Sequence, residues 1–352
     1  TWGDFDREAQ LFGLATPGGV VSQTGVGGLT LAGGFGWLRG SFGLSVDNVL
    51  AVEMVTANGE CVRASSQENP DLFWAVRGGG GNFGVVTAFE FQLHEIGPTV
   101  MFLAAMYRAA DAAHVIKRWR DFMSTGPDEI AGSYVEFSTI PEDPEFPRET
   151  WGEKVVTLAG VWAGPVEAGE PGVLPLRTLA DPLLDFSAPM AYCDVQSLFD
   201  PLFPKGELRA YFKSLYLDEL SDAIIDELVP RAVDRPSPDS LCSFWCMGGA
   251  MARVAPETMS FGGRQSAYMF SIDGIWRDPA DDEINIDWAR RFWRDVSRHS
   301  NGQSYLNFAG LGEEGEPLVR RSYGESNYDR LREVKRRYDP RNLFRFNLNI
   351  VA

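Results

Sequence analysis

Residues 24–48 read TGVGGLTLAGGFGWLRGSFGLSVDN, a stretch in which many glycines stand among apolar residues. Glycine lets the backbone approach a ligand closely, and so many glycines weaken any plain helix or strand. A flexible linker is the alternative, but linkers do not carry such an apolar load. The stretch therefore predicts a backbone cradle for a phosphate-bearing cofactor. Its glycines and interleaved apolar residues are Gly25, Val26, Gly27, Gly28, Leu29, Leu31, Gly33, Gly34, Phe35, Gly36, Trp37, Leu38 and Gly40.

A second glycine loop, RGGGGNFGVVT, occupies residues 77–87. Successive backbone N–H groups in such loops form an anion-binding nest. A flexible hairpin is the alternative. Asn82 tolerates unusual backbone geometry and Phe83 anchors the loop to an apolar surface, so both favour the nest. Neither loop is a Walker A motif, because no Gly-Lys-Ser/Thr follows, and the first is too rich in glycine to open a helix as a Rossmann fingerprint does.

Composition narrows the class of protein. The chain has 352 residues, 44% of them hydrophobic, and a formal net charge of -17. A negative surface disfavours nucleic acids and anionic membranes as partners. The four cysteines are scattered and lack zinc-finger or redox spacing, and the three histidines are too dispersed for a metal site. No apolar run is long enough to span a membrane, so we expect a soluble, cytoplasmic protein, with secretion left open because the chain looks cut at the front.

Local patterns predict an α+β organisation in the first hundred residues. A buried strand at residues 49–55, a tight turn at Asn58-Gly59 and a partner strand at 60–64 read as a hairpin. We expect a helix at 4–12, a short helix at 72–76 with Pro70 and Asp71 near its start, and a strand at 85–93.

The middle of the chain alternates strands and helices without glycine loops. This predicts an antiparallel sheet with helices on one face. Expected strands cover residues 101–107 (an edge strand), 131–138, 154–162, 208–214, 242–247 and 268–276, with helices at 109–122 and 217–228. A helix at 328–338 should stop before Pro340 and lead into an extended, Asn-rich strand. The expected domains are residues 1–96, 97–304 and 305–352.

Four pieces of the sequence resemble the berberine bridge enzyme-like FAD-linked oxidases, flavoproteins of the vanillyl-alcohol oxidase type. They are residues 18–48, residues 69–87, YLNF at 305–308 and DPRNLFRFNLNI at 339–350. The resemblance implies a PCMH-type FAD-binding domain, of which residues 1–96 form the second subdomain. It also implies an antiparallel sheet that roofs the flavin ring and a C-terminal tail that returns to the FAD site. Close backbone approach, N–H groups and apolar residues suit such a cofactor.

The same resemblance implies how FAD is held. The first loop, through Gly25, Val26, Gly27, Gly28, Gly33, Gly34 and Gly36, would wrap the pyrophosphate and ribityl chain. The adenine and diphosphate end would meet Gly80, Asn82, Phe83, Gly84, Val85 and Val86, and the flavin ring would lie near Asn347 and Asn349. This sequence departs from the family's pattern in two places. Family members carry an earlier subdomain, with a histidine that attaches to the flavin, which we expect to precede Thr1. Val21 occupies the position of a second attachment cysteine.

The family's Tyr-x-Asn motif matches Tyr305 and Asn307, and the resemblance implies that Tyr305 is the catalytic base. A free phenol has a pKa of about 10, so neighbours must shift it for work near neutral pH. Asp273 is expected to assist it, with Ser271 and Trp245 as substrate contacts. The alternatives are a packed tyrosine, a solvated carboxylate and a core tryptophan.

The predicted function is an FAD-dependent oxidoreductase that oxidises a carbinol or amine carbon of a sugar or secondary metabolite. Hydride would pass to flavin and electrons to molecular oxygen, giving hydrogen peroxide. A flavin dehydrogenase with another acceptor and a flavin-fold remnant without turnover are the alternatives. No metal is expected, and the oligomeric state is open.

Overall fold

The computed structural model describes residues 1–346 and 348–352, and in it the glycine-rich stretch forms short helices. Helix α2 (Val26–Leu31) begins after Gly25, whose backbone is extended, and α3 (Arg39–Phe42) follows. The expectation that this stretch holds too much glycine to open a helix is therefore wrong. Val26 and Leu29 are three residues apart, which is a helical spacing, and both helices are too short to depend on intrinsic propensity.

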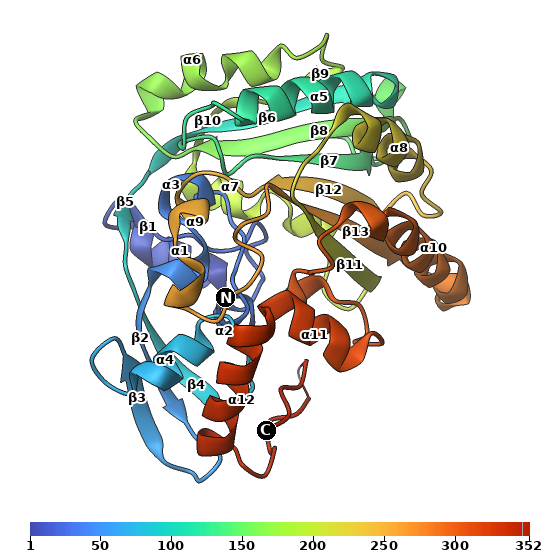
Figure 1. Ribbon diagram of the computed structural model, residues 1–352. Coiled ribbons are helices and arrows are strands. Elements are labelled where there is room, and N and C mark those ends of the chain that lie inside the picture. The colour runs from blue at the N-terminus through green and yellow to red at the C-terminus, as the bar shows by residue number, and fades with distance from the viewer. Residues whose placement is uncertain (347) are drawn as a thin grey trace.

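A three-stranded antiparallel sheet, ordered β3-β2-β4, lies at the lower end of the molecule (Figure 1). Its strands are β2 (Val49–Val55), β3 (Cys61–Ser65) and β4 (Val85–Phe91). Helices α4 (Pro70–Val76) and α12 (Glu325–Tyr338) contribute apolar side chains to one core with this sheet, so two helices far apart in the sequence share that core. The hairpin turns at Gly59, whose φ of 80° suits glycine.

An eight-stranded antiparallel sheet forms the upper half, in the order β10-β6-β8-β7-β12-β13-β11 with β9 paired to β6. Strand β6 (Thr99–Arg108) pairs with β8 on one side and with β9 and β10 on the other, so the expectation of an edge strand there is wrong. The remaining strands are β7 (Tyr134–Thr139), β8 (Lys154–Trp162), β9 (Leu184–Asp185), β10 (Ala188–Ala191), β11 (Arg209–Leu217), β12 (Leu241–Cys246) and β13 (Tyr268–Trp276).

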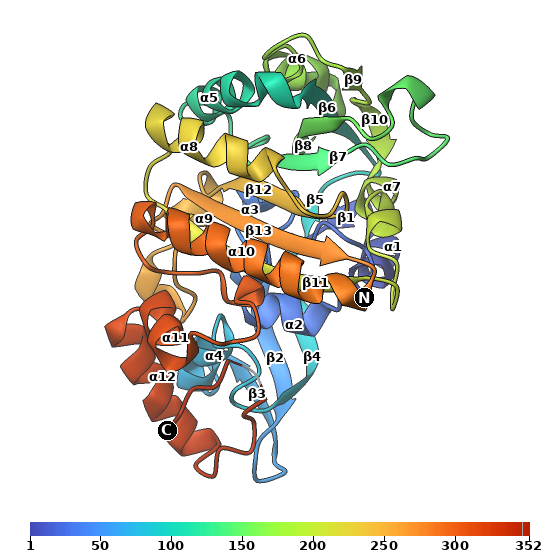
Figure 2. The same cartoon turned by 90° about the vertical axis from the view of Figure 1, so that its right-hand side faces the viewer.

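Four helices cover one face of this sheet, as expected for an α+β fold of this class (Figures 1 and 2). They are α5 (Ala112–Met123), α6 (Val166–Arg177), α8 (Asp222–Val233) and α10 (Asp282–Val296). Their apolar residues and every second residue of the strands make one buried core, which includes Trp119, Leu228, Phe270 and Phe292. This period-two burial fixes the register of the strands.

The opposite face of the eight-stranded sheet packs on the glycine-rich stretch. Phe35, Trp37 and Leu44 from that stretch share a core with Phe102 and Trp245 from the sheet. The glycine-rich stretch thus connects the two halves, because Leu31 packs against the core of the three-stranded sheet while Phe35 and Trp37 pack against the eight-stranded sheet.

Short elements complete the chain. They are α1 (Trp2–Gln10), β1 (Leu14–Ala15), β5 (His94–Glu95), α7 (Tyr192–Ser197), α9 (Ala250–Arg253) and α11 (Gly315–Tyr323). Residues 339–346 and 348–352 contain no strand, so an extended strand in the tail is not observed there. No described helix is long and apolar enough to cross a membrane. The domain boundaries at 96 and 304 stay a prediction.

Candidate functional site

A cavity of about 390 Å³ lies between the eight-stranded sheet and the glycine-rich stretch. Its roof comes from β7, β11, β12 and β13, and its other walls come from residues 20–35, 199–203 and 305–308. Aromatic side chains are the largest group in the lining. The volume is within the range of small-molecule sites. Tyr305 and Asp273 are 32 residues apart in the sequence, and both line this cavity.

Tyr305 is buried, with 3% of its surface exposed. It follows α10 after a short connection. Its phenolic oxygen accepts hydrogen bonds from the backbone N–H of Gly34 at 3.2 Å and from Nδ2 of Asn307 at 2.8 Å. Burial raises the pKa of Tyr305 to about 12, and the two donors lower it only in part. Two donors at one oxygen are the arrangement that stabilises a phenolate, whereas burial acts against it. The net direction is opposite to the shift expected from the sequence.

Two carboxyl groups line the roof, Glu136 on β7 and Asp273 on β13. Asp273 is 8% exposed, which rules out the alternative of a solvated carboxylate. Its Oδ2 accepts from Oγ of Ser271, and its Oδ1 has no hydrogen-bond partner in the described part of the chain. Burial raises the pKa of Asp273 well above its usual value, with a further contribution from Glu136. Ser271 thus orients the carboxyl group of Asp273.

Glu136 is a site residue that the sequence analysis missed. Burial raises its pKa to about 7, opposed by a hydrogen bond from Oγ of Ser243 at 3.2 Å and by the charge of Arg235. In the sheet register Glu136 lies opposite Ser243, which in turn lies opposite Ser271. A polar row therefore crosses three neighbouring strands on the cavity side. The segment YVEFST did not signal this, because an acidic residue that alternates with the apolar Val135 and Phe137 is also the pattern of a strand with one solvent-facing side.

Trp245 lines the cavity from β12 and is 6% exposed. Its ring stacks on Tyr134 at a centroid distance of 4.4 Å, and the guanidinium of Arg39 lies 5.0 Å from its ring centroid. Arg39 is fully buried and donates to three backbone carbonyl groups. Trp245 is both a core residue and a wall of the site, so the two alternatives for it are not exclusive.

The glycines of the first loop fall into two groups. A Cβ on Gly25 or Gly28 would meet nothing within 4 Å, and one on Gly27 would meet only the ring of Phe89 at 3.7 Å. By contrast, a Cβ on Gly34 or Gly36 would clash with the chain itself. Gly33 and Gly34 also have positive φ, and Val26 opens α2. Only the first group, where α2 begins with free N–H groups, presents open backbone to a ligand.

The second loop is tied to the C-terminal tail. Asn82 is buried; its Nδ2 donates to the carbonyl oxygens of Gly79 and Leu348, and its Oδ1 accepts from N–H of Ile350. Nζ of Lys335 donates to the Asn82 carbonyl oxygen and to the Asp339 carboxylate. The side-chain amide of Asn82 is thus engaged within the protein.

The other predicted residues of this region differ in exposure. Phe83 is fully buried, and a Cβ on Gly84 would strike Met54 and the Val55 carbonyl oxygen. Val85 is 56% exposed, Val86 is half-buried and Gly80 has a φ of 64°. Asn349 lies beside the Asn82 contacts, and its buried Oδ1 has no partner among the described residues. Asn347 lies outside the described residues.

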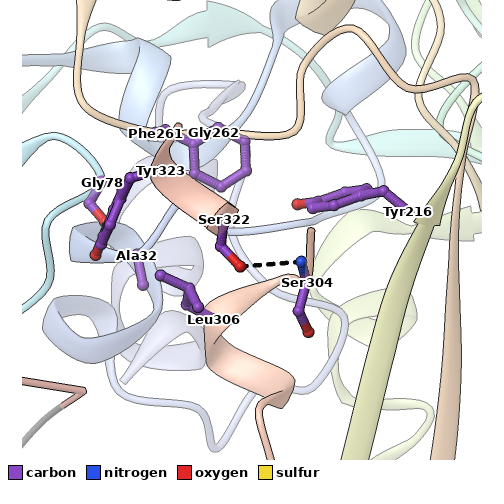
Figure 3. Close-up of a pocket in the computed structure, with 9 residues that line it drawn as sticks. All are labelled: Ala32, Gly78, Tyr216, Phe261, Gly262, Ser304, Leu306, Ser322 and Tyr323. Atoms are coloured by element: carbon purple, nitrogen blue, oxygen red, sulfur yellow. Dashed lines mark hydrogen bonds between the residues drawn. The ribbon is translucent and has the colours of Figure 1, made fainter. Parts of the chain in front are cut away.

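These observations fit FAD. The open backbone at Gly25 and Gly28 suits a phosphate, the unpartnered Oδ1 of Asn349 suits a donor on the ligand, and the aromatic cavity suits a ring system. A second, small cavity of about 10 Å³ sits where the Gly78 loop meets α11, at a hydrogen bond from N–H of Ser304 to Oγ of Ser322 (Figure 3). It has room for about one water molecule and is no candidate for the cofactor.

Comparison with known proteins gives matches over the whole chain. A family model described as "Berberine and berberine like" matches residues 304–351, and one described as "FAD binding domain" matches residues 1–65. The (R)-6-hydroxynicotine oxidase of Paenarthrobacter nicotinovorans is 30% identical, with 99% of this chain and 75% of that protein covered. An FAD-linked oxidoreductase of Dictyostelium discoideum is 29% identical, with 99% and 73% covered.

A solved structure gives the same picture in three dimensions. The 6-hydroxy-D-nicotine oxidase of Arthrobacter nicotinovorans superposes with a TM-score of 0.82 at 27% identity, covering 99% of this chain and 76% of that one. The present chain therefore spans about three-quarters of the length of these relatives.

Proposed function

The chain belongs to the berberine bridge enzyme-like FAD-linked oxidoreductases, and from that premise we propose that it is an oxidase of a small molecule bound in the roofed cavity. Its enzyme class and its cofactor, FAD, follow from the family. The reaction we propose is oxidation of a carbinol or amine carbon, with molecular oxygen as the final acceptor and hydrogen peroxide as the product. One observation carries the proposal: Tyr305, with two donors on its oxygen, shares a cavity with two carboxyl groups.

FAD and the residues of the cavity have separate roles in the proposed reaction. When bound, FAD supplies the acceptor for the two electrons and the hydrogen that leave the substrate carbon. Tyr305 takes the proton from the substrate O–H or N–H as the phenolate, and the N–H of Gly34 and Nδ2 of Asn307 stabilise that phenolate before the transfer, against the burial that raises its pKa. Asp273, oriented by Ser271, assists Tyr305 from the roof of the cavity.

The cofactor contacts are proposed on the same footing. Gly25, Val26, Gly27 and Gly28 would hold the pyrophosphate at the start of α2, where the backbone is open. Asn349 would face the flavin. Some residues of the two loops would support the cofactor site without touching FAD, because other residues of the chain fill the space around them. They are Gly33, Gly34, Gly36, Gly84 and Phe83.

The visible spectrum of the FAD-loaded protein tests the reaction type. Flavin absorbance that bleaches with substrate without air and recovers when air is admitted identifies an oxidase. Recovery only with an added electron acceptor identifies a dehydrogenase instead. A purified chain that retains no flavin when FAD is supplied would contradict the proposal.

Tyr305→Phe tests the base. The ring and its edge contact with Phe35 at 4.6 Å are kept, whereas the proton acceptor is lost. We expect unchanged flavin content and flavin reduction slowed by roughly 10²–10⁴-fold, the usual range for a positioned general base. Stopped-flow absorbance measures the rate.

The matched control is Tyr216→Phe. Tyr216 is also buried, with a pKa raised by burial, but it lies outside the large cavity and its hydroxyl has no partner among the described residues. This variant should reduce its flavin at the wild-type rate. Flavin reduction at the wild-type rate in Tyr305→Phe would contradict the role of Tyr305, and Asp273 would then be tested as the base.

A further inference from the structure

The charge of the cavity lining points to one class of substrate. Glu136 and Asp273 both face the cavity, whereas no Lys, Arg or His belongs to its lining as far as the chain is described. Neither carboxyl group has a salt-bridge partner within the described residues, although Arg235 lies near enough to Glu136 to affect it. When ionised, the two groups make the roof a negative surface with nothing inside the cavity to neutralise it.

A second observation concerns the hydrogen bonding of Asp273 in the roof. Asp273 is more than nine-tenths buried, it lines the cavity, and its Oδ1 finds no hydrogen-bond partner in residues 1–346 and 348–352. A buried carboxyl oxygen without a partner costs free energy, and buried polar groups in proteins are otherwise nearly always satisfied. When Asp273 is ionised, the partner that Oδ1 lacks is a hydrogen-bond donor, and the small exposed part of this residue lines the cavity.

The remaining walls favour a cation over a polyhydroxylated molecule. Phe212 and Phe308 pack edge to face at 5.4 Å, and Trp245 stacks with Tyr134. Aromatic faces attract cations, most strongly when water is excluded. A sugar needs many polar contacts. Apart from the two carboxyl groups and Tyr305, the polar groups of the lining are the side chains of Thr24 and Asn307, the Tyr134 hydroxyl and the Trp245 indole N–H, and the rest of the lining is apolar.

We propose that Glu136 and Asp273 select an amine substrate, which enters as the ammonium ion and places its N–H against the roof carboxylates and its apolar body against the aromatic walls. This inference rests on the proposed function, since it names the substrate class of the same cavity. It decides between the carbinol and amine alternatives in favour of the amine. Glu136 acts here as a specificity residue.

Isothermal titration calorimetry on the FAD-loaded full chain tests the proposal with two probes of similar shape. N-methylbenzylamine is cationic at pH 8, and benzyl methyl ether is its neutral counterpart. We expect the amine to bind at least tenfold more tightly. Glu136→Gln and Asp273→Asn should each weaken binding of the amine by about tenfold to 100-fold, the worth of one charge-assisted hydrogen bond, and should leave binding of the ether unchanged.

Asp6→Asn is the control for replacing a buried acid. Burial raises the pKa of Asp6 to about 7, as for Glu136, but Asp6 accepts a hydrogen bond from Gln196 and lies outside the cavity. Its variant should bind both probes like the wild type. Flavin content and melting temperature of all three variants verify folding, and the two roof variants act at separate strands, so one misfolded variant leaves the other informative.

Proton release gives an independent readout. A permanent cation favours the ionised form of Glu136, so benzyltrimethylammonium binding at pH 7 should release a fraction of a proton, measured as a dependence of binding heat on the buffer. The groups that face Glu136 are Ser243 and Arg235, with Tyr134 on its own strand and Asp273 across β12. Glu136→Gln should abolish the release.

Three results would overturn the inference. They are equal or tighter binding of the ether, equal effects of the roof variants on both probes, and no binding of the amine at millimolar concentration. The proposed function fails separately. An amine that binds without ever bleaching the flavin leaves this inference standing and removes the oxidase, whereas a carbinol that bleaches the flavin while amines fail to bind does the reverse.

Discussion

The two faces of the eight-stranded sheet are made of alternate residues of the same strands, yet they differ in chemistry. On β13, Phe270 and Ile272 enter the core under the helices, whereas Ser271 and Asp273 point to the other side. The helix-covered face is almost entirely apolar. The cavity-facing side carries a row of hydroxyl and carboxyl groups, including two acids whose pKa values burial raises.

The difference separates stability from function along one strand. Burying apolar surface stabilises the fold, whereas burying an acid without an ion-pair partner costs free energy. The sheet can carry this cost because its helix-covered face contributes a large core. Substitutions at neighbouring positions should therefore have effects of different kinds, and the following three predictions test this.

The largest effect is expected on the helix-covered face. Phe270→Ala removes a fully buried ring that packs against Phe244 at 4.5 Å and Phe292 at 5.6 Å. We expect the free energy of unfolding to fall by about 3–5 kcal/mol, measured by urea denaturation. Its neighbour Ser271→Ala loses only a hydrogen bond to Asp273 and should cost about 1 kcal/mol. Equal losses would mean that the two faces do not differ as described.

A smaller effect is expected from pH on the cavity side. Burial raises the pKa of Glu136 from 4.5 to about 7, so the folded protein holds this proton more tightly than the unfolded chain. Its contribution to stability is therefore lost as the pH rises from about 4.5 to about 7, by up to about 3 kcal/mol. Asp273 acts in the same direction. Glu136→Gln should flatten this part of the curve of unfolding free energy against pH, and an unchanged slope would contradict the burial of the charge.

The smallest effect is expected at the hydroxyl that supports Glu136. Ser243→Ala removes the donor to Oε2 of Glu136, so the ionised carboxylate loses about 1 kcal/mol of stabilisation and its pKa rises further. The midpoint of the same pH curve should move upward. Ser138→Ala is the matched control. Ser138 lies on β7, the strand that carries Glu136, but its hydroxyl forms a hydrogen bond with Thr157. A shift of equal size in both variants would remove the special role of Ser243.

Much of the fold was predictable from the sequence because its strongest patterns are continuous. Strands at residues 49–55, 154–162 and 268–276 have the predicted bounds, since each is an apolar run between turn residues. The short strand β10, with Pro189 in it, gave no such pattern and was missed. The position of β6 inside the sheet depends on pairings with residues about 50 to 90 positions later, which local patterns do not contain.

The site was predictable only in part. Glycines and the Tyr-x-Asn motif are local signals, and Tyr305 and Asn307 do lie together in the cavity. Glu136 was missed because one acidic residue on a strand reads as solvent-facing until the opposite layer is known. The direction of the Tyr305 pKa was also out of reach, because it depends on how far the surrounding aromatic rings exclude water.

The bond between Asn82 and the tail has a consequence for how the protein is made. Its partners lie 266 and 268 residues further along the chain. At about 5–20 residues per second of synthesis, roughly 10–50 s separate the appearance of the loop from that of its partners. During that time the loop has no tail to close against, while the strands and helices between them are already leaving the ribosome. Any ligand that needs this junction is therefore captured only after residues 348–350 have been made.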